Sequence, residues 1–330
     1  MRTVIVRSPG GPEVLELIDR PVPSPRSNEV LIRAKAMGVS RPDILIRKGV
    51  YTWMPPLPAS PGSELTGVVE AVGDAVDTIR AGQNVLLSAR DLPVRGGCYT
   101  EYIAVPADAV HPLPEGVDFD QAVVVPTYLV AYAMLNDLGM RPGTRSVFVA
   151  GATGGVGGAL VELAKAAGLE VIGSVGSDER AAHARALGVD HVVNYRTDSM
   201  VERVMALTGG RGVDICFDHI LGEKFTDFLD MLADFGTLVF YNVHAPMPES
   251  DVFAALCAAS KKTPALRCFN IHTYDSNPQR RRELTRAIIA LLAAGKIKPR
   301  VGARLPLANA AEAHRLLESG SVLGKIVLHP

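Results

Sequence analysis

Hydrophobic residues follow two different patterns along the 330-residue chain, and the pattern changes near residue 125. Before that point, short apolar runs such as 30–34, 67–72 and 84–87 alternate with prolines and glycines. Apolar runs of this length, bounded by turn residues, predict β-strands, and the frequent prolines disfavour helices. We therefore expect residues 1–124 to form a β-rich domain.

From residue 125 onward, segments with the helical spacing of apolar residues alternate with short segments that are apolar throughout. This alternation predicts an α/β domain with a doubly wound parallel sheet. The predicted helices are 121–138, 158–168, 178–187, 200–207 and 224–232, and the predicted strands are 147–150, 170–175, 189–194, 213–218 and 237–241.

The C-terminal segment carries two further predicted helices, 280–294 and 308–318, and a final strand, 324–328. We expect this segment to return to the first domain, which is then discontinuous. The predicted domains are therefore 1–124 with 267–330, and 125–266.

A glycine-rich turn lies at the first strand–helix junction of the α/β region. Its residues are Gly151, Ala152, Thr153, Gly154, Gly155, Val156 and Gly157, a GxxGxxG spacing rather than the commoner GxGxxG. Glycines allow a tight turn and close backbone approach, and a helix N-terminus offers free N–H groups to a phosphate. Another strand follows the helix and completes a βαβ unit. We interpret the turn as a dinucleotide-binding site; the alternative is that the glycines only let the helix pack closely on the sheet.

Composition indicates a soluble globular protein of about two domains and excludes several partners. Charged residues make up 21% of the chain and the formal net charge is −1, which gives no reason to expect nucleic acid or an anionic membrane as partner. No apolar stretch suits a membrane span or a signal peptide. Four scattered cysteines without a CxxC pair favour a reducing compartment, so we predict a cytoplasmic protein.

Several separated motifs resemble those of the zinc-independent quinone reductases, the zeta-crystallin-type branch of the medium-chain dehydrogenase/reductase superfamily. The motifs are 38–43 with 47–51, 61–69, 97–102, 293–299, 311–314 and 324–328. They cover nearly the whole chain, in the order that the family shows. The resemblance implies a GroES-like β-rich catalytic domain joined to a Rossmann cofactor domain. It also implies a homodimer, because relatives pair the edge strands of their cofactor domains.

Zinc-dependent members of the same superfamily differ from this chain at their metal ligands. Where they have a cysteine and a histidine, the chain has Ser40 and Ser63, and a hydroxyl is a poor zinc ligand. The cysteine lobe of their structural zinc is missing too, since Cys98 stands alone. We therefore predict no metal site. Three isolated histidines near strand ends are expected to make ordinary hydrogen bonds: His219, His244 and His272.

Without a Lewis acid, hydride can still be transferred to an acceptor that delocalises the negative charge it gains. A quinone or an α,β-unsaturated carbonyl is such an acceptor. Such a reaction needs a hydrogen-bond donor for the developing oxyanion. The resemblance implies Tyr51 as the proton donor; Ser40 is the alternative, and a packing role for Tyr51 stays open. Trp53, Tyr128 and Tyr241 are expected to line the acceptor site, and a surface or hinge position for Trp53 is an equal alternative. The resemblance implies that Tyr128 and Tyr241 are bulkier than the residues of many relatives at these positions.

The expected cofactor is NADPH. NAD-specific Rossmann enzymes have an acidic residue at the end of the second strand, whereas this chain has Val175 there. The resemblance implies that Ser177, Arg180 and Tyr195 surround the 2′-phosphate; the alternative is that Arg180 is an ordinary surface charge. The resemblance also implies that the residues of the glycine turn, together with Phe240 and Asn242, bind the cofactor.

The resulting prediction is a zinc-free, NADPH-dependent reductase of a small-molecule quinone or enone. One alternative is an enoyl-thioester or polyketide-type enoyl reductase, for which the run 280–282 of three arginines is a candidate phosphate site. Another is a non-catalytic NADPH-binding sensor or crystallin-like protein.

Overall fold

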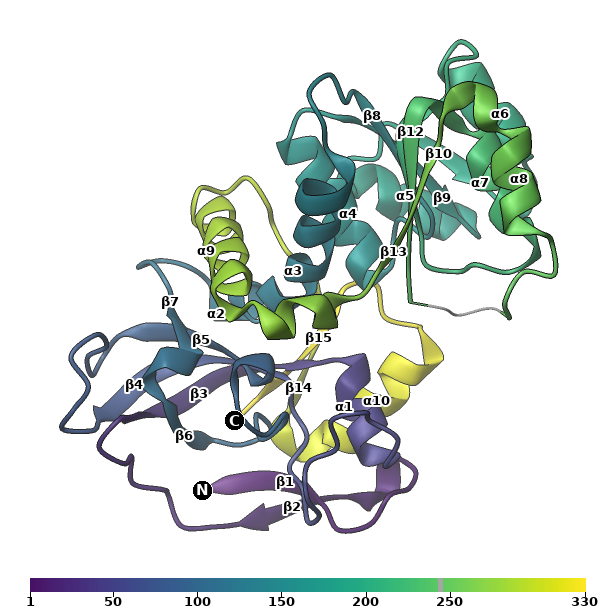
Figure 1. Cartoon of the computed structure of the whole chain (residues 1–330). Helices are drawn as coiled ribbons and strands as arrows, with labels where there is room; N and C mark the ends of the chain where they lie inside the picture. The colour runs from purple at the N-terminus through teal and green to yellow at the C-terminus, as the bar shows by residue number, and fades with distance from the viewer. Residues whose placement is uncertain (243–245) are drawn as a thin grey trace. The chain divides into compact units, whose positions relative to one another are not determined.

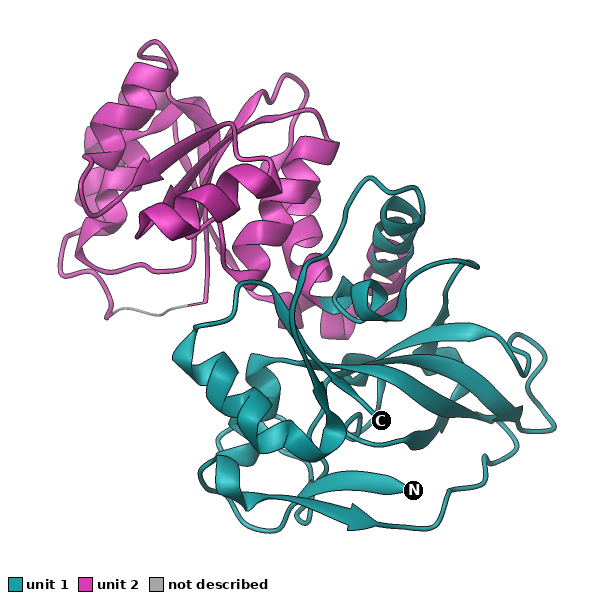
Figure 2. Ribbon diagram, turned by 180° about the vertical axis from the view of Figure 1, so that it is seen from behind, with its two compact units in different colours: residues 1–126, 285–330 teal, residues 127–284 magenta. Residues whose placement is uncertain are grey.

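The structure, a computed structural model, describes residues 1–242 and 246–330, so that His244 lies outside the described residues. The chain divides into two compact units (Figure 2): unit 1 comprises Met1–Pro126 and Thr285–Pro330, and unit 2 comprises Thr127–Leu284. Unit 2 continues past the predicted boundary at residue 266. The reason is that strand β13 (Ala265–Phe269) pairs with β12 (Leu232–Tyr241) and so belongs to the sheet of this unit.

Unit 2 is built on a six-stranded sheet with the strand order β10-β9-β8-β11-β12-β13 (Figure 1). All neighbouring strands are parallel. The strands before β12 are β8 (Ser146–Val149), β9 (Glu170–Val175), β10 (His191–Asn194) and β11 (Val213–Asp218). The chain order runs outward in both directions from the β8–β11 pair, as a doubly wound sheet requires.

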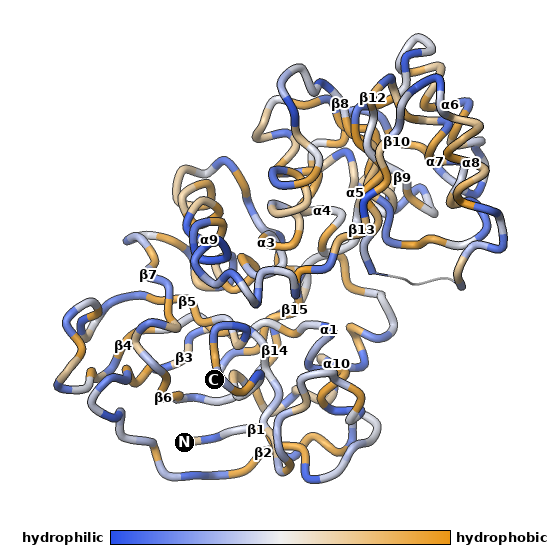
Figure 3. The backbone as a smooth tube through the Cα atoms, in the orientation of Figure 1, coloured by the Kyte–Doolittle hydropathy of each residue, from blue (hydrophilic) through white to orange (hydrophobic). Residues whose placement is uncertain are grey.

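The helices of unit 2 cover both faces of this sheet. Helices α4 (Gly155–Ala166) and α5 (Asp178–Leu187) pack on one face; α6 (Met200–Leu207), α7 (Asp227–Asp230) and α8 (Val252–Ala258) pack on the other. The second face buries an apolar cluster that includes Phe148, Phe225 and Phe228. Figure 3 shows hydrophobic residues concentrated where the strands run side by side. Strands covered on both faces are apolar throughout, and β8 is buried along its whole length.

Unit 1 contains a seven-stranded sheet, with the order β14-β15-β3-β4-β5-β7 and β6 paired to β3, and a separate β1–β2 pair. Its elements are β1 (Arg2–Val6), β2 (Leu15–Asp19), β3 (Glu29–Val39), α1 (Arg41–Arg47), β4 (Glu64–Val72), β5 (Asn84–Ser88), β6 (Tyr102–Pro106), β7 (Val110–Pro112), α2 (Phe119–Ala122), β14 (Val301–Pro306), α10 (Ala310–Ser319) and β15 (Lys325–His329). The C-terminal strand β15 pairs with β3, so the tail does return to the first sheet. A β-rich unit and a doubly wound unit confirm the predicted fold class.

Three stretches differ from the sequence prediction. The predicted helix 121–138 is interrupted: α2 ends at Ala122, α3 (Val125–Ala133) follows, and Met134–Gly139 forms a π-helical turn. The predicted helix 224–232 shrinks to α7, because β12 already begins at Leu232. Helix α8 was not predicted. The remaining long helix, α9 (Pro278–Ala293), lies close to its predicted range.

Candidate functional site

The glycine turn connects β8 to α4, as predicted, but the helix begins at Gly155 rather than at residue 158. Gly151 has a φ of +61°, a conformation that favours glycine. A Cβ on Gly157 would collide with the carbonyl oxygen of Gly151, so glycine is required there too. A Cβ at Gly154 or Gly155 would come no closer than 3.3 Å to its neighbours.

The N-terminus of α4 is open to a ligand. Its N-cap residue, Gly154, has no side chain that could cap it, and the first N–H groups of any α-helix lack intrahelical partners. With the positive end of the helix dipole, these groups favour a phosphate. The turn therefore fits the diphosphate of a dinucleotide.

Residues predicted to surround the 2′-phosphate converge beside this turn. The Ser177 hydroxyl caps α5 by accepting a hydrogen bond from the backbone N–H of Arg180. The Arg180 guanidinium donates to the Thr153 hydroxyl over 3.3 Å, which ties α5 to the glycine turn. Tyr195, which follows β10, lies against Gly176: a Cβ there would be 2.5 Å from the Tyr195 hydroxyl oxygen. One cation and three hydroxyls thus lie near the end of β9.

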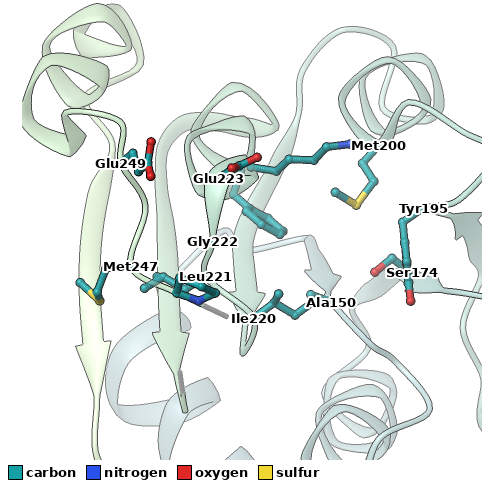
Figure 4. Close-up of a pocket in the computed structure, with 13 residues that line it drawn as sticks. Ala150, Ser174, Tyr195, Met200, Ile220, Leu221, Gly222, Glu223, Met247 and Glu249 are labelled. Carbon is teal, nitrogen blue, oxygen red and sulfur yellow. The ribbon is translucent and has the colours of Figure 1, made fainter. Parts of the chain in front are cut away.

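A pocket of about 490 Å³ lies at the same edge of the unit 2 sheet (Figure 4). Tyr195 and Ser174 stand on one side, Met247 and Glu249 on the other, and Ala150, Ile220 and Leu221 lie between them. The Ser174 hydroxyl accepts a hydrogen bond from the Gly151 N–H, which places the pocket next to the glycine turn. Its largely apolar lining suits a flat aromatic ring system.

Sequence reasoning missed most of the residues that line this pocket. They are Ala150, Ser174, Met200, Ile220, Leu221, Gly222, Glu223, Lys224, Phe228, Pro246, Met247 and Glu249. The available signal was positional, because most of them lie at the end of a predicted strand or in the segment after one, and ligands of doubly wound sheets bind at the carboxyl ends of the strands.

Asp218, the last residue of β11, shapes one wall of the pocket. Its buried carboxylate accepts hydrogen bonds from the N–H groups of Ile220 and Leu221, at 2.9 and 2.8 Å. Burial raises the pKa of Asp218, and the two amides oppose that rise. Leu221 has a φ of +63°, which is rare for a residue other than glycine. The carboxylate compensates for this strained turn and fixes the wall.

The other predicted residues of unit 2 have more varied surroundings. The ring of Phe240 packs edge-on against Phe225, and Asn242 is exposed with a φ of +49°. Tyr241 is buried, and that burial raises the pKa of its hydroxyl. Tyr128 is buried as well, and its hydroxyl donates to Glu162 in α4 over 3.0 Å.

In unit 1, Ser40 lies within a buried ionic network. Its hydroxyl donates to Glu64 Oε1 over 2.9 Å and accepts from Lys325 Nζ over 2.6 Å. Lys325 Nζ is also 2.5 Å from Glu64 Oε2, and both side chains are less than 10% exposed, at 8% and 6%. The proton of Ser40 is thereby committed to Glu64, so it is not available to a substrate in this arrangement.

Asp43 forms the second part of this network and is fully buried. Its carboxylate accepts hydrogen bonds from the Ser40 N–H, the Gly62 N–H and the hydroxyls of Ser63 and Tyr99. Burial, with the negative charge of the adjacent glutamate, raises its pKa to about 7, although the bond from Ser63 acts in the opposite direction. The two serines at the superfamily's zinc-ligand positions are therefore both engaged in protein hydrogen bonds.

Tyr51 and Trp53 lie together after α1. Their ring centroids are 5.7 Å apart, and the Arg95 guanidinium carbon lies 4.5 Å from the centre of the Trp53 ring, a cation–π contact. Among the described residues, none accepts a hydrogen bond from the Tyr51 hydroxyl or donates one to it. Tyr51 is half-buried and Trp53 is 39% exposed.

Comparison with known proteins places the chain in a family. A family model described as "Alcohol dehydrogenase GroES-like domain" matches residues 26–115, and one described as "Zinc-binding dehydrogenase" matches residues 187–328. A quinone oxidoreductase of Rattus norvegicus is 31% identical over 334 residues, which cover 99% of this chain and 97% of the relative. The chain belongs to the quinone oxidoreductase family of medium-chain dehydrogenases/reductases. It is therefore an oxidoreductase.

Solved structures of this family share the fold along the whole chain. A structure described as an NAD-dependent alcohol dehydrogenase has a TM-score of 0.87 and 33% identity, and the match covers 100% of both chains. A quinone oxidoreductase of Escherichia coli in complex with NADPH has a TM-score of 0.83 and 29% identity, also with full coverage of both. The two descriptions name different cofactors, so the choice of cofactor depends on the residues of each chain.

Within residues 1–242 and 246–330, no three histidine, cysteine or acidic side chains gather in a way that could hold a metal ion. None of the helices in these ranges has the length and hydrophobicity that crossing a bilayer requires.

Proposed function

We propose that the protein is an NADPH-dependent reductase that transfers hydride to a quinone or an α,β-unsaturated carbonyl compound, without zinc. The observation that carries this proposal is the convergence of Thr153, Ser177, Arg180 and Tyr195 beside an uncapped helix N-terminus. Val175, the last residue of β9, occupies the position where NAD-specific enzymes have an acidic residue.

The cofactor site fits NADPH better than NADH on chemical grounds. A guanidinium and several hydroxyls match the oxygen atoms of a phosphate monoester, and a buried valine, Val175, cannot bind ribose hydroxyls. The glycine turn has room for the diphosphate because Gly154 and Gly155 carry no side chain. The adjacent apolar pocket accommodates the purine.

When bound, NADPH supplies the hydride. The residues of this chain bind the cofactor, orient the acceptor and protonate it. We propose Tyr51 as the proton donor to the acceptor. Its hydroxyl is not engaged by any described residue, whereas the proton of Ser40 is held by Glu64. Trp53, with Tyr128 and Tyr241, is proposed to shape the acceptor site.

The test is NADPH consumption with a panel of simple quinones and enones, with NADH in parallel. We expect turnover with NADPH in metal-free buffer and no loss of activity with a chelator. NADPH binding without turnover of any acceptor would favour a non-catalytic role. Dependence of activity on added zinc would contradict the proposal.

The enoyl-thioester alternative loses support from the arginine run. Arg280 forms ion pairs with Asp137 and Glu283, and the buried Arg281 donates to the carbonyl of Tyr274. These two side chains are committed within unit 2. Including an enoyl-CoA in the acceptor panel tests this alternative directly.

We also propose a cytoplasmic homodimer that pairs β13 of one copy with β13 of another. β13 is an edge strand of the six-stranded sheet, and an unpaired edge is suited to such pairing. Light scattering of the wild-type protein should give the mass of two chains. The variant Leu266→Pro, on β13, should give the mass of a single chain, because proline disrupts the pairing of this strand.

A further inference from the structure

His219 occupies the switch point of the unit 2 sheet. It directly follows β11, while Gly151 comes two residues after the end of β8, and these strands are neighbours. To one side of this pair the order continues β9, β10, and to the other β12, β13. Dinucleotides bind where the strand order reverses in this way. Gly151 and His219 therefore both lie at the place where the middle of a dinucleotide would bind.

The imidazole of His219 lies in contact with the glycine turn. A Cβ on Gly151 would lie 2.5 Å from His219 Cε1, so the imidazole ring lies directly against the Cα of the first glycine. The ring centroid of Tyr241 is 5.9 Å from that of His219, with the planes inclined by 33°. The imidazole thus lies between the glycine turn and the end of β12. His219 is half-buried.

The position of His219 separates it from the purine pocket. Its neighbour Ile220 lines that pocket, as does Ala150, which precedes Gly151; His219 itself does not. The glycine turn, residues 151–157, contains no ionisable side chain. A titratable imidazole is therefore placed beside a turn that offers a diphosphate its backbone N–H groups and the Thr153 hydroxyl, but no charged side chain.

We propose that the His219 imidazole donates a hydrogen bond to a phosphate oxygen of the cofactor's diphosphate, so that cofactor affinity rises when the ring is protonated. This inference rests on the proposed NADPH site and adds a contact outside the 2′-phosphate residues. Histidine is the side chain whose charge changes between about pH 5 and 8. A hydrogen bond from a charged donor is about twice as strong as one from a neutral donor.

Other titratable groups near the ring do not replace it in this role. On β11, Asp218 is acidic and accepts the amides of its own turn. On β12, burial keeps the Tyr241 hydroxyl protonated. Glu223 and Lys224, farther along the loop after β11, line the purine pocket instead.

The test measures the dissociation constant of NADPH for wild type, His219→Gln and His219→Ala at about pH 6 and pH 8, by quenching of intrinsic fluorescence. His219→Gln keeps a neutral N–H donor and serves as the conservative variant. We expect His219→Ala to weaken NADPH binding about 10- to 150-fold at pH 6 and about 2- to 12-fold at pH 8. His219→Gln should retain part of the affinity for NADPH, but its affinity relative to that of His219→Ala should not change between pH 6 and pH 8. His191→Gln, at the first position of β10 and so at the end of the strand away from the cofactor site, is the matched control and should bind as wild type does.

A cofactor fragment shows where the contact is made. Adenosine 2′-monophosphate carries the 2′-phosphate but neither phosphate of the diphosphate bridge, so the variants should bind it as wild type does. Equal NADPH affinity of wild type and His219→Ala at both pH values would overturn the inference, as would an equal loss of affinity for adenosine 2′-monophosphate. Failure of wild type to bind NADPH at all would instead refute the proposed function, and the inference with it. Thermal melting of each variant confirms that it is folded.

Discussion

Replacing Lys325 by methionine tests the buried network that holds Ser40. The ammonium of Lys325 contacts both Glu64 Oε2, at 2.5 Å, and the Ser40 hydroxyl, at 2.6 Å. Methionine removes the charge and leaves the Glu64 carboxylate, whose side chain is 6% exposed, without a counter-ion. Breaking a buried ion pair in this way costs about 3–5 kcal/mol. For a domain of this size we expect the melting temperature to fall by about 6–20 °C.

The double variant Glu64→Gln with Lys325→Met provides the control. It removes both charges and keeps an acceptor for the Ser40 hydroxyl, so its melting temperature should recover most of the loss, since neutral replacement of a buried pair is often tolerated. Thermal unfolding followed by circular dichroism, with both variants in the same buffer, decides the matter. A single variant that melts within about 2 °C of wild type, or a double variant that is less stable than the single one, would refute the reasoning.

Three further predictions concern affinity, turnover and pH. Arg180→Ala should reduce the preference for NADPH over NADH by about 10- to 150-fold, as measured by the two dissociation constants; an unchanged preference would return Arg180 to the role of a surface charge. Tyr51→Phe should lower enone turnover about 100-fold and quinone turnover less, while Ser40→Ala should alter both much less; the reverse ranking would make Ser40 the donor. The pKa of Asp43, about 7, is above that of the unfolded chain, so its contribution to the unfolding free energy should fall by about 4 kcal/mol as the pH rises from about 4 to 7. Comparing urea unfolding of wild type and Asp43→Asn across this range isolates that slope.

The elements around the glycine turn could be predicted from sequence because their signals are local. Strands β9 and β11 and helices α5 and α6 have the predicted bounds, since each combines a clear apolar pattern with a cap or turn residue at its ends. Helix α8 gave a weak signal, because none of its residues is fully buried.

The interactions around Ser40 could not be predicted in the same way. Lys325 is 285 positions away from Ser40 in the chain, and only the pairing of β15 with β3 brings the two together. From sequence alone, Ser40 and Tyr51 are competing proton donors, and our proposal of Tyr51 rests on the hydrogen bond between Ser40 and Glu64. For His219, the sequence alone predicts an isolated histidine, because its contact with Gly151 depends on the neighbouring positions of β8 and β11 in the sheet.

The most direct test of the central claim follows the hydride itself. NADPH with both hydrogens at the nicotinamide C4 position replaced by deuterium is incubated with the protein and a simple enone, and the product is examined by mass spectrometry and NMR. The account predicts one deuterium at the β-carbon of the saturated ketone for each NADPH consumed, at an undiminished rate when a chelator is present. A product without deuterium, or consumption that requires added zinc, would contradict it.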